Sequence, residues 1–225
     1  MTIILSITLM AQELTPSTMT IKLPSSAINP SYCGTIKSQL TKMESSWTTF
    51  PIAFQIDSTV PDYFQESIRK SAQMWNTALG FPAISISENM ASLVDHKLSK
   101  NNNVIAWSTN PQDLRPKTEG ETFMTWKGSK IKSANILLNA AYYQFSFEGM
   151  DPNKIDLTSL MLHEFGHALG LEHSLNEDSV MRDGLKVGEI RQDFSEEDLN
   201  IALCSIEKTK VDLYNFGSVL AEDRP

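Results

Sequence analysis

The chain has 225 residues, 41% of them hydrophobic, which is enough to bury one sizeable core, so a single folded domain is expected. Its formal net charge of -8 argues against nucleic acid or an anionic membrane surface as the main partner, because both reward a basic patch. No stretch beyond the N-terminus is long and apolar enough for a membrane helix, so we expect the mature protein to be soluble, with no membrane partner. We also expect a monomer.

An apolar run from Ile3 to Ala11 opens the sequence. It is too short to span a bilayer but suits a signal peptide, although no Lys or Arg precedes it and a buried strand is the alternative. We therefore expect residues 1–11 to be a signal peptide and the protein to be secreted, extracellular or periplasmic. Residues 12–49 are rich in Ser, Thr and Pro, which predicts an extended leader ahead of a domain over residues 50–225.

A strand and a long helix open the expected domain. Apolar residues alternate with less apolar ones from Phe50 to Ile56, which predicts a strand with one buried face. Pro61 and Asp62 then begin a segment in which apolar residues recur every three or four positions, and Gly80 closes it. This pattern predicts an amphipathic helix.

Several short strands follow that helix. The predicted spans are Ala83 to Ser87, Val104 to Trp107, Glu121 to Trp126 and Ala134 to Asn139. Residues 101–103 and 110–120 have the composition of loops. A strand, a long helix and then several strands before another helix predict an α/β (α+β) fold, with the first helix packed on a twisted, mostly parallel sheet.

Two more helices are expected in the second half of the chain. In the first, Asp156 can cap the free N–H groups, and Gly170 can take the left-handed conformation that ends a helix. In the second, Ser195 is the N-cap and acidic residues fill the first turn, where the helix dipole favours them. Cys204 lies off the apolar stripe of this terminal helix and can therefore face a neighbouring segment.

The segment from Leu160 to Ser174 holds three of the chain's four histidines. On a helix, His163 and His167 project from one face about one turn apart, close enough to bind the same ion. A helix that stops at Gly170 lets the chain turn back and deliver His173. Three neutral imidazoles leave a fourth tetrahedral position for water, which is the layout of a catalytic zinc site.

Zinc is the expected metal, because imidazole is a borderline ligand and tetrahedral geometry costs a filled-shell ion nothing. Glu164 sits beside the paired histidines, too poorly placed to complete the coordination itself. It is the candidate catalytic base, which would accept the proton of an activated water and later pass it to the leaving amine. The predicted reaction is therefore hydrolysis of a peptide bond.

The run from His163 to His173 matches the metzincin motif HExxHxxGxxH at every fixed position. Ser179 to Met181 resembles the Met-turn of that clan, with Met181 beneath the metal. Ser174 and the terminal segment FSEEDLNIALCSIE make the chain most similar to the matrixins, the matrix-metalloproteinase-like group. This resemblance implies a zincin-like catalytic domain: a five-stranded sheet above a cleft, an active-site helix at its floor, and a small C-terminal lobe with a terminal helix.

The resemblance also implies how a protein or peptide substrate binds. An extended substrate would pair with an antiparallel edge strand made of Glu121, Thr122, Phe123, Met124, Thr125 and Trp126. The side chain after the scissile bond would enter a pocket near Leu160 and the loop from Met181 to Gly188. Animal matrixins hold a second zinc with upstream histidines, but residues 97–162 contain no His before the motif, so we expect only the catalytic Zn²⁺. Calcium sites are common in the family and cannot be placed here.

The two cysteines leave three alternatives open. Cys33 and Cys204 can form a disulfide, as an even count in an exported protein suggests, or remain two unpaired thiols. The residues around Cys33 also partly resemble the cysteine switch of the matrixin prodomain, in which a thiolate occupies the open zinc position. The Arg before and the Pro-Asp after that cysteine are missing here.

A second class of function also fits these residues. A zincin-like binding module could keep its metal without turning over a substrate. Retention of Glu164 favours the enzyme, because a non-catalytic protein has no chemical need for a carboxylate at that position.

Overall fold

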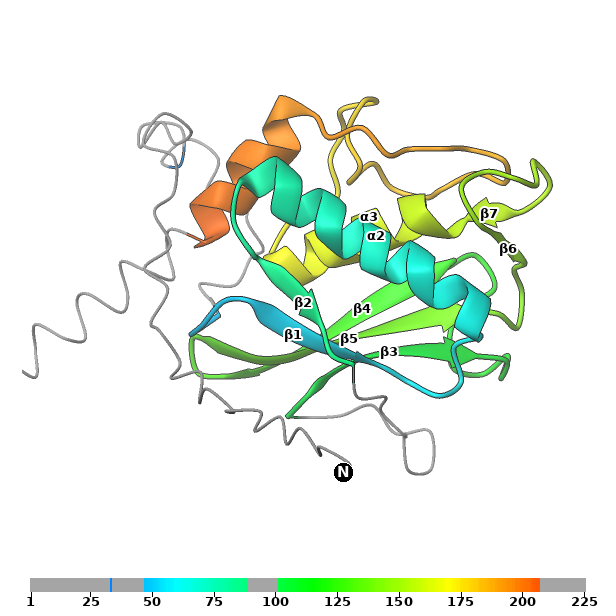
Figure 1. Ribbon diagram of the computed structural model, residues 1–225, viewed down its shortest axis with the longest axis horizontal. Coiled ribbons are helices and arrows are strands. Elements are labelled where there is room, and N and C mark those ends of the chain that lie inside the picture. Colours follow the sequence, from blue (N-terminus) through cyan, green and yellow to red (C-terminus); the bar gives the residue numbers. More distant parts are fainter. Residues whose placement is uncertain (1–32, 34–46, 89–100, 207–225) are drawn as a thin grey trace, which may run out of the picture.

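A twisted five-stranded sheet lies beneath two long helices that cover one of its faces (Figure 1). The computed structural model describes Cys33 and residues 47–88 and 101–206. In order along the sheet, the strands are β2 (Ile84–Ile86), β1 (Ile52–Ile56), β3 (Asn103–Ser108), β5 (Lys130–Asn139) and β4 (Gly120–Lys127). Neighbouring strands are parallel, except that β4 runs antiparallel to β5 at the edge. The predicted fold class is therefore confirmed.

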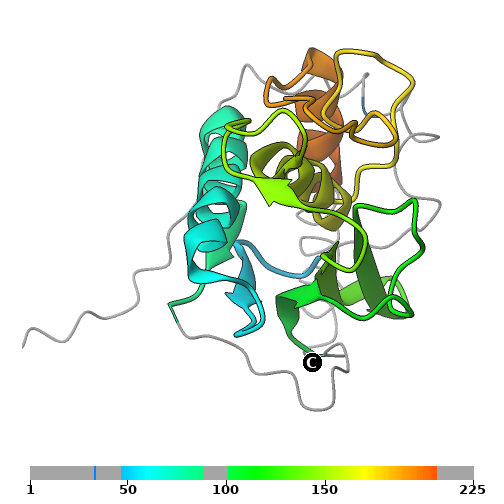
Figure 2. The same cartoon turned by 90° about the vertical axis from the view of Figure 1, so that its right-hand side faces the viewer.

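Helices α2 (Asp62–Leu79) and α3 (Leu157–Leu169) pack against each other on the covered face. Figure 2 shows both helices on the same side of the strands. The apolar stripe of α2 is buried, and the indole N–H of Trp75 donates to the carbonyl of Leu162, 2.9 Å away. This bond satisfies a buried polar group and fixes how α2 lies against α3.

Three strands begin earlier than the sequence pattern indicated, and β4 does so by one residue, at Gly120. β3 begins at Asn103, which was expected in a loop, because its side chain joins the neighbouring strands: the amide donates to Ala53 O and accepts from Ala134 N, both at 2.8 Å. β5 begins at Lys130 rather than Ala134 and pairs with Lys127 across a tight turn. The extra residues of this hairpin are partly charged, so the alternation of apolar residues did not reveal them.

Helix α3 has the ends that the sequence predicted. The carboxylate of Asp156 accepts from the backbone N–H of Ser159 at 2.8 Å, which caps the N-terminus. Gly170 adopts φ 101°, and its N–H returns to the carbonyls of Gly166 and His167. That conformation is strained for other residues, so the glycine ends the helix and redirects the chain. Just before α3, the short strands β6 (Phe145–Ser146) and β7 (Ile155–Asp156) pair in parallel.

The described part of the terminal lobe includes a helix over residues 196–206, coloured orange to red in Figure 1. The hydroxyl of Ser195 accepts from the backbone N–H of Asp198 at 3.2 Å, as expected of an N-cap. Trp47, which precedes the expected start of the domain, is buried, and its indole N–H donates to Ala168 O at 2.8 Å. The chain therefore contributes to the core ahead of Phe50.

Cys33 and Cys204 are joined by a disulfide, with their Cα atoms 5.4 Å apart. Cys204 is buried on the terminal helix. The expected signal peptide, residues 1–11, lies outside the described residues, as does the expected leader apart from Cys33 and residues 47–49. Within the described parts of the chain, no helix is long and apolar enough to cross a membrane.

Candidate metal centre

Three imidazoles converge where α3 ends and the chain turns back. His163 and His167 come from the partly buried side of α3, and His173 comes from the segment after Gly170. Nε2 of His163 lies 3.0 Å from Nε2 of His167 and 3.2 Å from Nε2 of His173. All three candidate ligand atoms lie within 4.8 Å of one another.

The outer nitrogens of these rings are held by acceptors. Nδ1 of His163 lies 2.9 Å from the carbonyl oxygen of Val180, and Nδ1 of His167 lies 2.8 Å from that of Leu171. Because a carbonyl can only accept, each Nδ1 must carry the proton, which leaves a lone pair on each Nε2. Nδ1 of His173 lies 3.4 Å from the carboxylate of Asp183.

This donor set fits a zinc ion. The Nε2 lone pairs of His163 and His167 face one another at 3.0 Å with no proton between them, and Nε2 of His173 lies 3.2 Å from that of His163, an arrangement that a cation between the three nitrogens satisfies. Tetrahedral Zn–N bonds of about 2.0–2.1 Å would place the nitrogens roughly 3.3–3.4 Å apart, close to the separations observed.

Burial keeps the rings in the neutral form that binds a metal. Burial, and then the nearby His167, hold the pKa of His163 well below its usual 6.5. Burial is also the main reason that the pKa values of His167 and His173 are lowered. The three imidazoles are therefore neutral at pH 7.

Glu164 lies beside the triad and is almost completely buried, at 2% exposure. The hydroxyl of Thr122 on β4 lies 2.6 Å from Oε2 of this carboxyl and 3.1 Å from the backbone oxygen of Glu164. Burial raises the pKa of Glu164 to about 7, and the hydrogen bond from Thr122 opposes this rise. A carboxyl with such a pKa can both accept and return a proton near neutral pH.

The expected Met-turn, Ser179 to Met181, is held in place by hydrogen bonds to the terminal helix. Met181 is buried, and its sulfur would lie 2.2 Å from a Cβ added at Gly166, so only glycine allows this approach to α3. The buried carboxylate of Asp198 accepts from the Ser179 hydroxyl and, at 3.1 Å, from the backbone N–H of Val180. Asp198 therefore holds the same peptide segment whose carbonyl orients His163.

A cleft of ≈ 390 Å³ runs between β4 and the triad. Of the residues expected to bind substrate, Glu121, Thr122 and Met124 border it. The side chain of Phe123 instead packs on the opposite face of the sheet, against a small apolar cluster. Successive side chains of a strand point to opposite faces, so only part of this segment can present side chains to the cleft.

The two remaining members of that segment lie farther along β4. The hydroxyl of Thr125 is 2.8 Å from that of Ser133, and Trp126 is 41% exposed. Leu160, Gly184 and Leu185 border the cleft, where the pocket next to the scissile bond was expected.

Three contacts were not predicted: those of Thr122 with Glu164, of Asp198 with the turn, and of Arg191 with the loop before it. Thr122 and Glu164 are 42 residues apart, so no local pattern reports their contact. The sequence pattern explained Asp198 as one of the acidic residues that favour the first turn of a helix, so it gave no sign of a contact with another segment. Arg191 lies in a stretch without periodicity, and only its position near the predicted pocket loop could have drawn attention to it.

Comparison with known proteins identifies related sequences. The sequence model of one family, described as matrixin, matches residues 46–202, well over half of the chain. The chain is also 53% identical over 38 residues to matrix metalloproteinase-25 of Mus musculus. That alignment covers 17% of this chain and only 6% of the mouse protein. The resemblance predicted from the histidine motif is confirmed.

Proposed function

This chain belongs to the matrixin family of zinc-dependent metallopeptidases, and we propose that it is an exported endopeptidase that cleaves peptide bonds within extended protein substrates. The observation that carries this proposal is the convergence of three neutral imidazoles beside a buried glutamate. The single disulfide supports export, because disulfides persist in oxidising compartments.

We assign the metal to His163, His167 and His173, and the proton transfer to Glu164. A zinc ion bound by the three Nε2 atoms would supply Lewis acidity, acidifying a water and polarising the scissile carbonyl. Glu164 accepts the proton of the attacking water and then donates it to the leaving amine. Its burial supports this role, because a carboxyl with a pKa near 7 is matched to both transfers.

Thr122 accommodates both forms of Glu164. A hydroxyl has one proton to donate, and it has two acceptors within reach. When Glu164 is ionised, the hydroxyl donates to Oε2, which leaves Oε1 to receive the proton. When Oε1 is protonated, Oε2 remains an acceptor, so the hydroxyl can still donate to Oε2 or donate to the backbone oxygen of Glu164 instead.

The edge strand supplies the substrate site. β4 pairs with β5 on one side, and among the described residues no strand pairs with its other side. The backbone N–H and C=O groups on that side can hydrogen-bond to the backbone of an extended peptide. Such bonds hold the substrate's main chain whatever its side chains are. The negative net charge favours a protein substrate over a nucleic-acid or anionic membrane partner, and we expect the enzyme to act as a monomer.

The test is cleavage of an unfolded protein by the purified chain, with zinc content measured on the same samples. We expect about one zinc per chain, loss of cleavage with a chelator, and recovery when zinc is restored. Glu164→Gln should keep its zinc and lose cleavage by a factor on the order of 100 to 10,000, whereas His167→Ala should lose both. Stoichiometric zinc without cleavage in wild type and Glu164→Gln alike would indicate the binding module instead.

A further inference from the structure

The three imidazoles of the triad differ in what holds their outer nitrogen. Nδ1 of His163 and Nδ1 of His167 each face a backbone carbonyl. Nδ1 of His173 instead lies 3.4 Å from a carboxylate oxygen of Asp183. Among the residues that the structure describes, no backbone carbonyl is hydrogen-bonded to this nitrogen. The candidate acceptor for the third ring is therefore a charged group.

His173 needs such a support more than the other two ligands do. His163 and His167 lie on α3, where the helix backbone fixes them, but His173 follows the end of the helix and its side chain is 47% exposed. A neutral imidazole carries its proton on either nitrogen, and only the form protonated at Nδ1 presents a lone pair at Nε2. An acceptor at Nδ1 selects that form.

Backbone pairing brings Asp183 to His173. The N–H of Ser174 donates to the carbonyl of Met181 at 2.9 Å, and Ser174 forms an isolated parallel bridge with Arg182. The residue after His173 is thus paired with the residue before Asp183. The two segments therefore lie side by side where the ring and the carboxylate meet.

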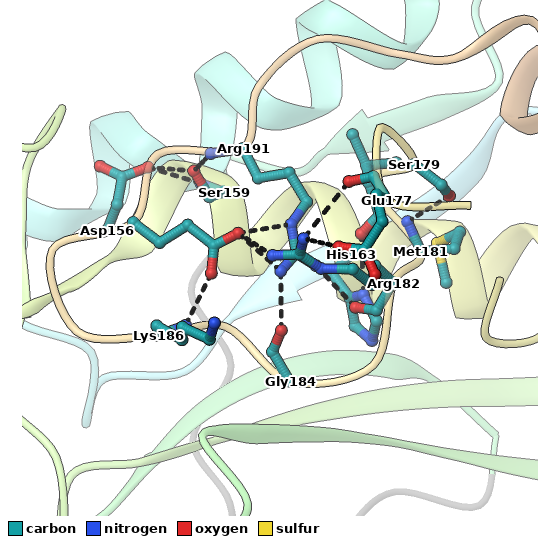
Figure 3. A network of polar contacts seen from close by, with 12 residues as sticks. Asp156, Ser159, His163, Glu177, Ser179, Met181, Arg182, Gly184, Lys186 and Arg191 are labelled. Atoms are coloured by element: carbon teal, nitrogen blue, oxygen red, sulfur yellow. Dashed lines mark hydrogen bonds and ion pairs between the residues drawn. The ribbon is translucent and has the colours of Figure 1, made fainter. Parts of the chain in front are cut away.

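One guanidinium holds the backbone on both sides of Asp183 (Figure 3). Arg191 is only 8% exposed, and it donates from Nη1 to the carbonyl of Arg182 at 2.6 Å and from Nη2 to that of Gly184 at 2.8 Å. Glu189 balances its charge and accepts from Nε and Nη2, at 3.1 and 2.9 Å. The planar fork of arginine reaches all of these acceptors at once.

This anchoring decides whether an exposed contact persists. The side chain of Asp183 is 82% exposed, and exposed ion pairs contribute little when both partners move freely. Here the carboxylate extends from a backbone that is held at the residue before it and at the residue after it. Only the short side chain of aspartate remains to be ordered, so little conformational entropy is lost when it meets the ring.

We propose that Asp183 is a positioning residue for the zinc site: its carboxylate accepts the Nδ1–H of His173, and the fork of Arg191 holds it in place. This inference rests on the proposed function, because that function includes the zinc. Asp183 acts through His173 rather than on the ion or the reacting atoms. By fixing the ring and increasing its basicity, the carboxylate strengthens the third ligand.

The zinc affinity of Asp183→Asn, measured by competition with a chelator, tests this role. Loss of such a support costs about 10–100-fold in metal affinity, so the dissociation constant should rise by about tenfold or more. The side chain is exposed, so the urea midpoint of the zinc-free variant should stay at that of wild type. An unchanged dissociation constant would overturn the proposal.

Glu172→Gln is the matched control. It removes the same charge from the residue next to His173, which is exposed and borders the same cleft. Because an exposed charge that makes no direct contact is screened by salt, this variant should change the dissociation constant by less than about twofold. Equal losses in Glu172→Gln and Asp183→Asn would mean that only net charge matters and would also overturn the proposal.

The ring nitrogens provide a signature that a merely structural role would not move. In zinc-loaded protein labelled with ¹⁵N, NMR reports the chemical shift of each Nδ1 through the carbon-bound ring protons. Asp183→Asn should move the shift of Nδ1 of His173 and leave those of His163 and His167, which face carbonyls, in place. Movement of all three shifts, or of none, would contradict a contact specific to His173.

A double-variant cycle tests the part assigned to Arg191. Arg191→Lys keeps the charge but loses the fork, so it should weaken zinc binding, and adding it to Asp183→Asn should cost little more. Additive losses would mean that Arg191 does not act through Asp183. If Arg191→Lys does not fold, as judged by circular dichroism, the two readouts on Asp183→Asn decide.

The same measurements separate this proposal from the proposed function. If wild type binds no zinc, both fail. If wild type binds zinc but cleaves no protein, the proposed function fails, and the zinc affinity of Asp183→Asn still decides the role of Asp183.

Discussion

At the residue scale, the site depends on the hydrogen bond that each side chain makes with the polar atom that faces away from the shared centre. His163 and His167 each give Nδ1 to a backbone carbonyl and so present Nε2 toward the shared centre. Glu164 gives Oε2 to Thr122 and so keeps Oε1 for the proton. In each case an interaction behind the reactive atom sets its orientation and charge state.

Removal of the Thr122 hydroxyl should impair turnover more than binding. Thr122→Val keeps the shape of the side chain but leaves Glu164 without its donor, and a hydrogen bond to a charged group contributes about 1.5–3 kcal/mol. We expect kcat to fall by about tenfold or more, with KM nearly unchanged. Thr122→Ser retains the hydroxyl and should restore most of kcat; equal losses in the two variants would contradict a positioning role.

Zinc should remain bound to unusually low pH for a histidine site. Protons compete with the metal only as pH falls through the ligands' pKa values, and burial lowers those values below 6.5 for all three histidines. Equilibrium dialysis followed by metal analysis should therefore find full zinc occupancy at pH 6.5 and release only on further acidification. Substantial release between pH 7.5 and 6.5 would contradict the lowered pKa values.

The site could be predicted from sequence only where neighbours along the chain create it. The spacing of His163, His167 and His173 around Gly170 is local, so their convergence followed from helix geometry and one glycine. The partner of Glu164 comes from a distant strand. That pairing depends on how β4 is placed over α3, which no spacing in the sequence encodes.

At the element scale, the terminal helix and the Met-turn act as one unit. Asp198 is 1% exposed and binds Ser179, Val180 and Ser195, so it joins the first turn of the helix to the segment that orients His163. The sequence predicted this helix and its cap correctly. It could not reveal that Asp198 is buried, because the neighbouring acids on the same turn are more exposed and give the same pattern.

Asp198→Ala should weaken both the fold and the metal site. It leaves buried donors of Ser179 and Val180 without an acceptor, so the free energy of unfolding should fall by about 2 kcal/mol or more in urea titrations. Zinc affinity, measured by chelator competition, should fall on the order of tenfold, as for other supports of a metal ligand. Glu196→Ala on the same turn is the control, because Glu196 is exposed; similar losses in both variants would contradict the role of Asp198.

At the scale of the whole molecule, the disulfide joins segments far apart in the sequence. Cys33 and Cys204 are 171 residues apart, and the bond attaches the N-terminal part of the chain to the terminal helix. The fold itself followed from sequence because hydrophobic periodicity and glycine placement marked α2, α3 and the five strands of the main sheet, although not the short pair β6 and β7. The disulfide was one of three alternatives that the sequence left open, because two cysteines are also compatible with free thiols.

Loss of the disulfide should lower stability without changing the metal site. A cross-link over so long a loop restricts the unfolded chain, so Cys33→Ser, Cys204→Ser and the double variant should each lose about 2–4 kcal/mol of unfolding free energy. The double variant should lose no more than either single variant, because all three break the same bond. Rapid maleimide labelling of both thiols in the native protein without reductant would contradict the bond.

We propose that the three imidazoles hold one zinc ion with a position left open to water. X-ray absorption at the zinc edge of the zinc-loaded protein tests it most directly. We expect three imidazole nitrogens at about 2.0–2.1 Å and one exchangeable oxygen. A sulfur ligand at about 2.3 Å, or a coordination shell already closed by protein side chains, would contradict it.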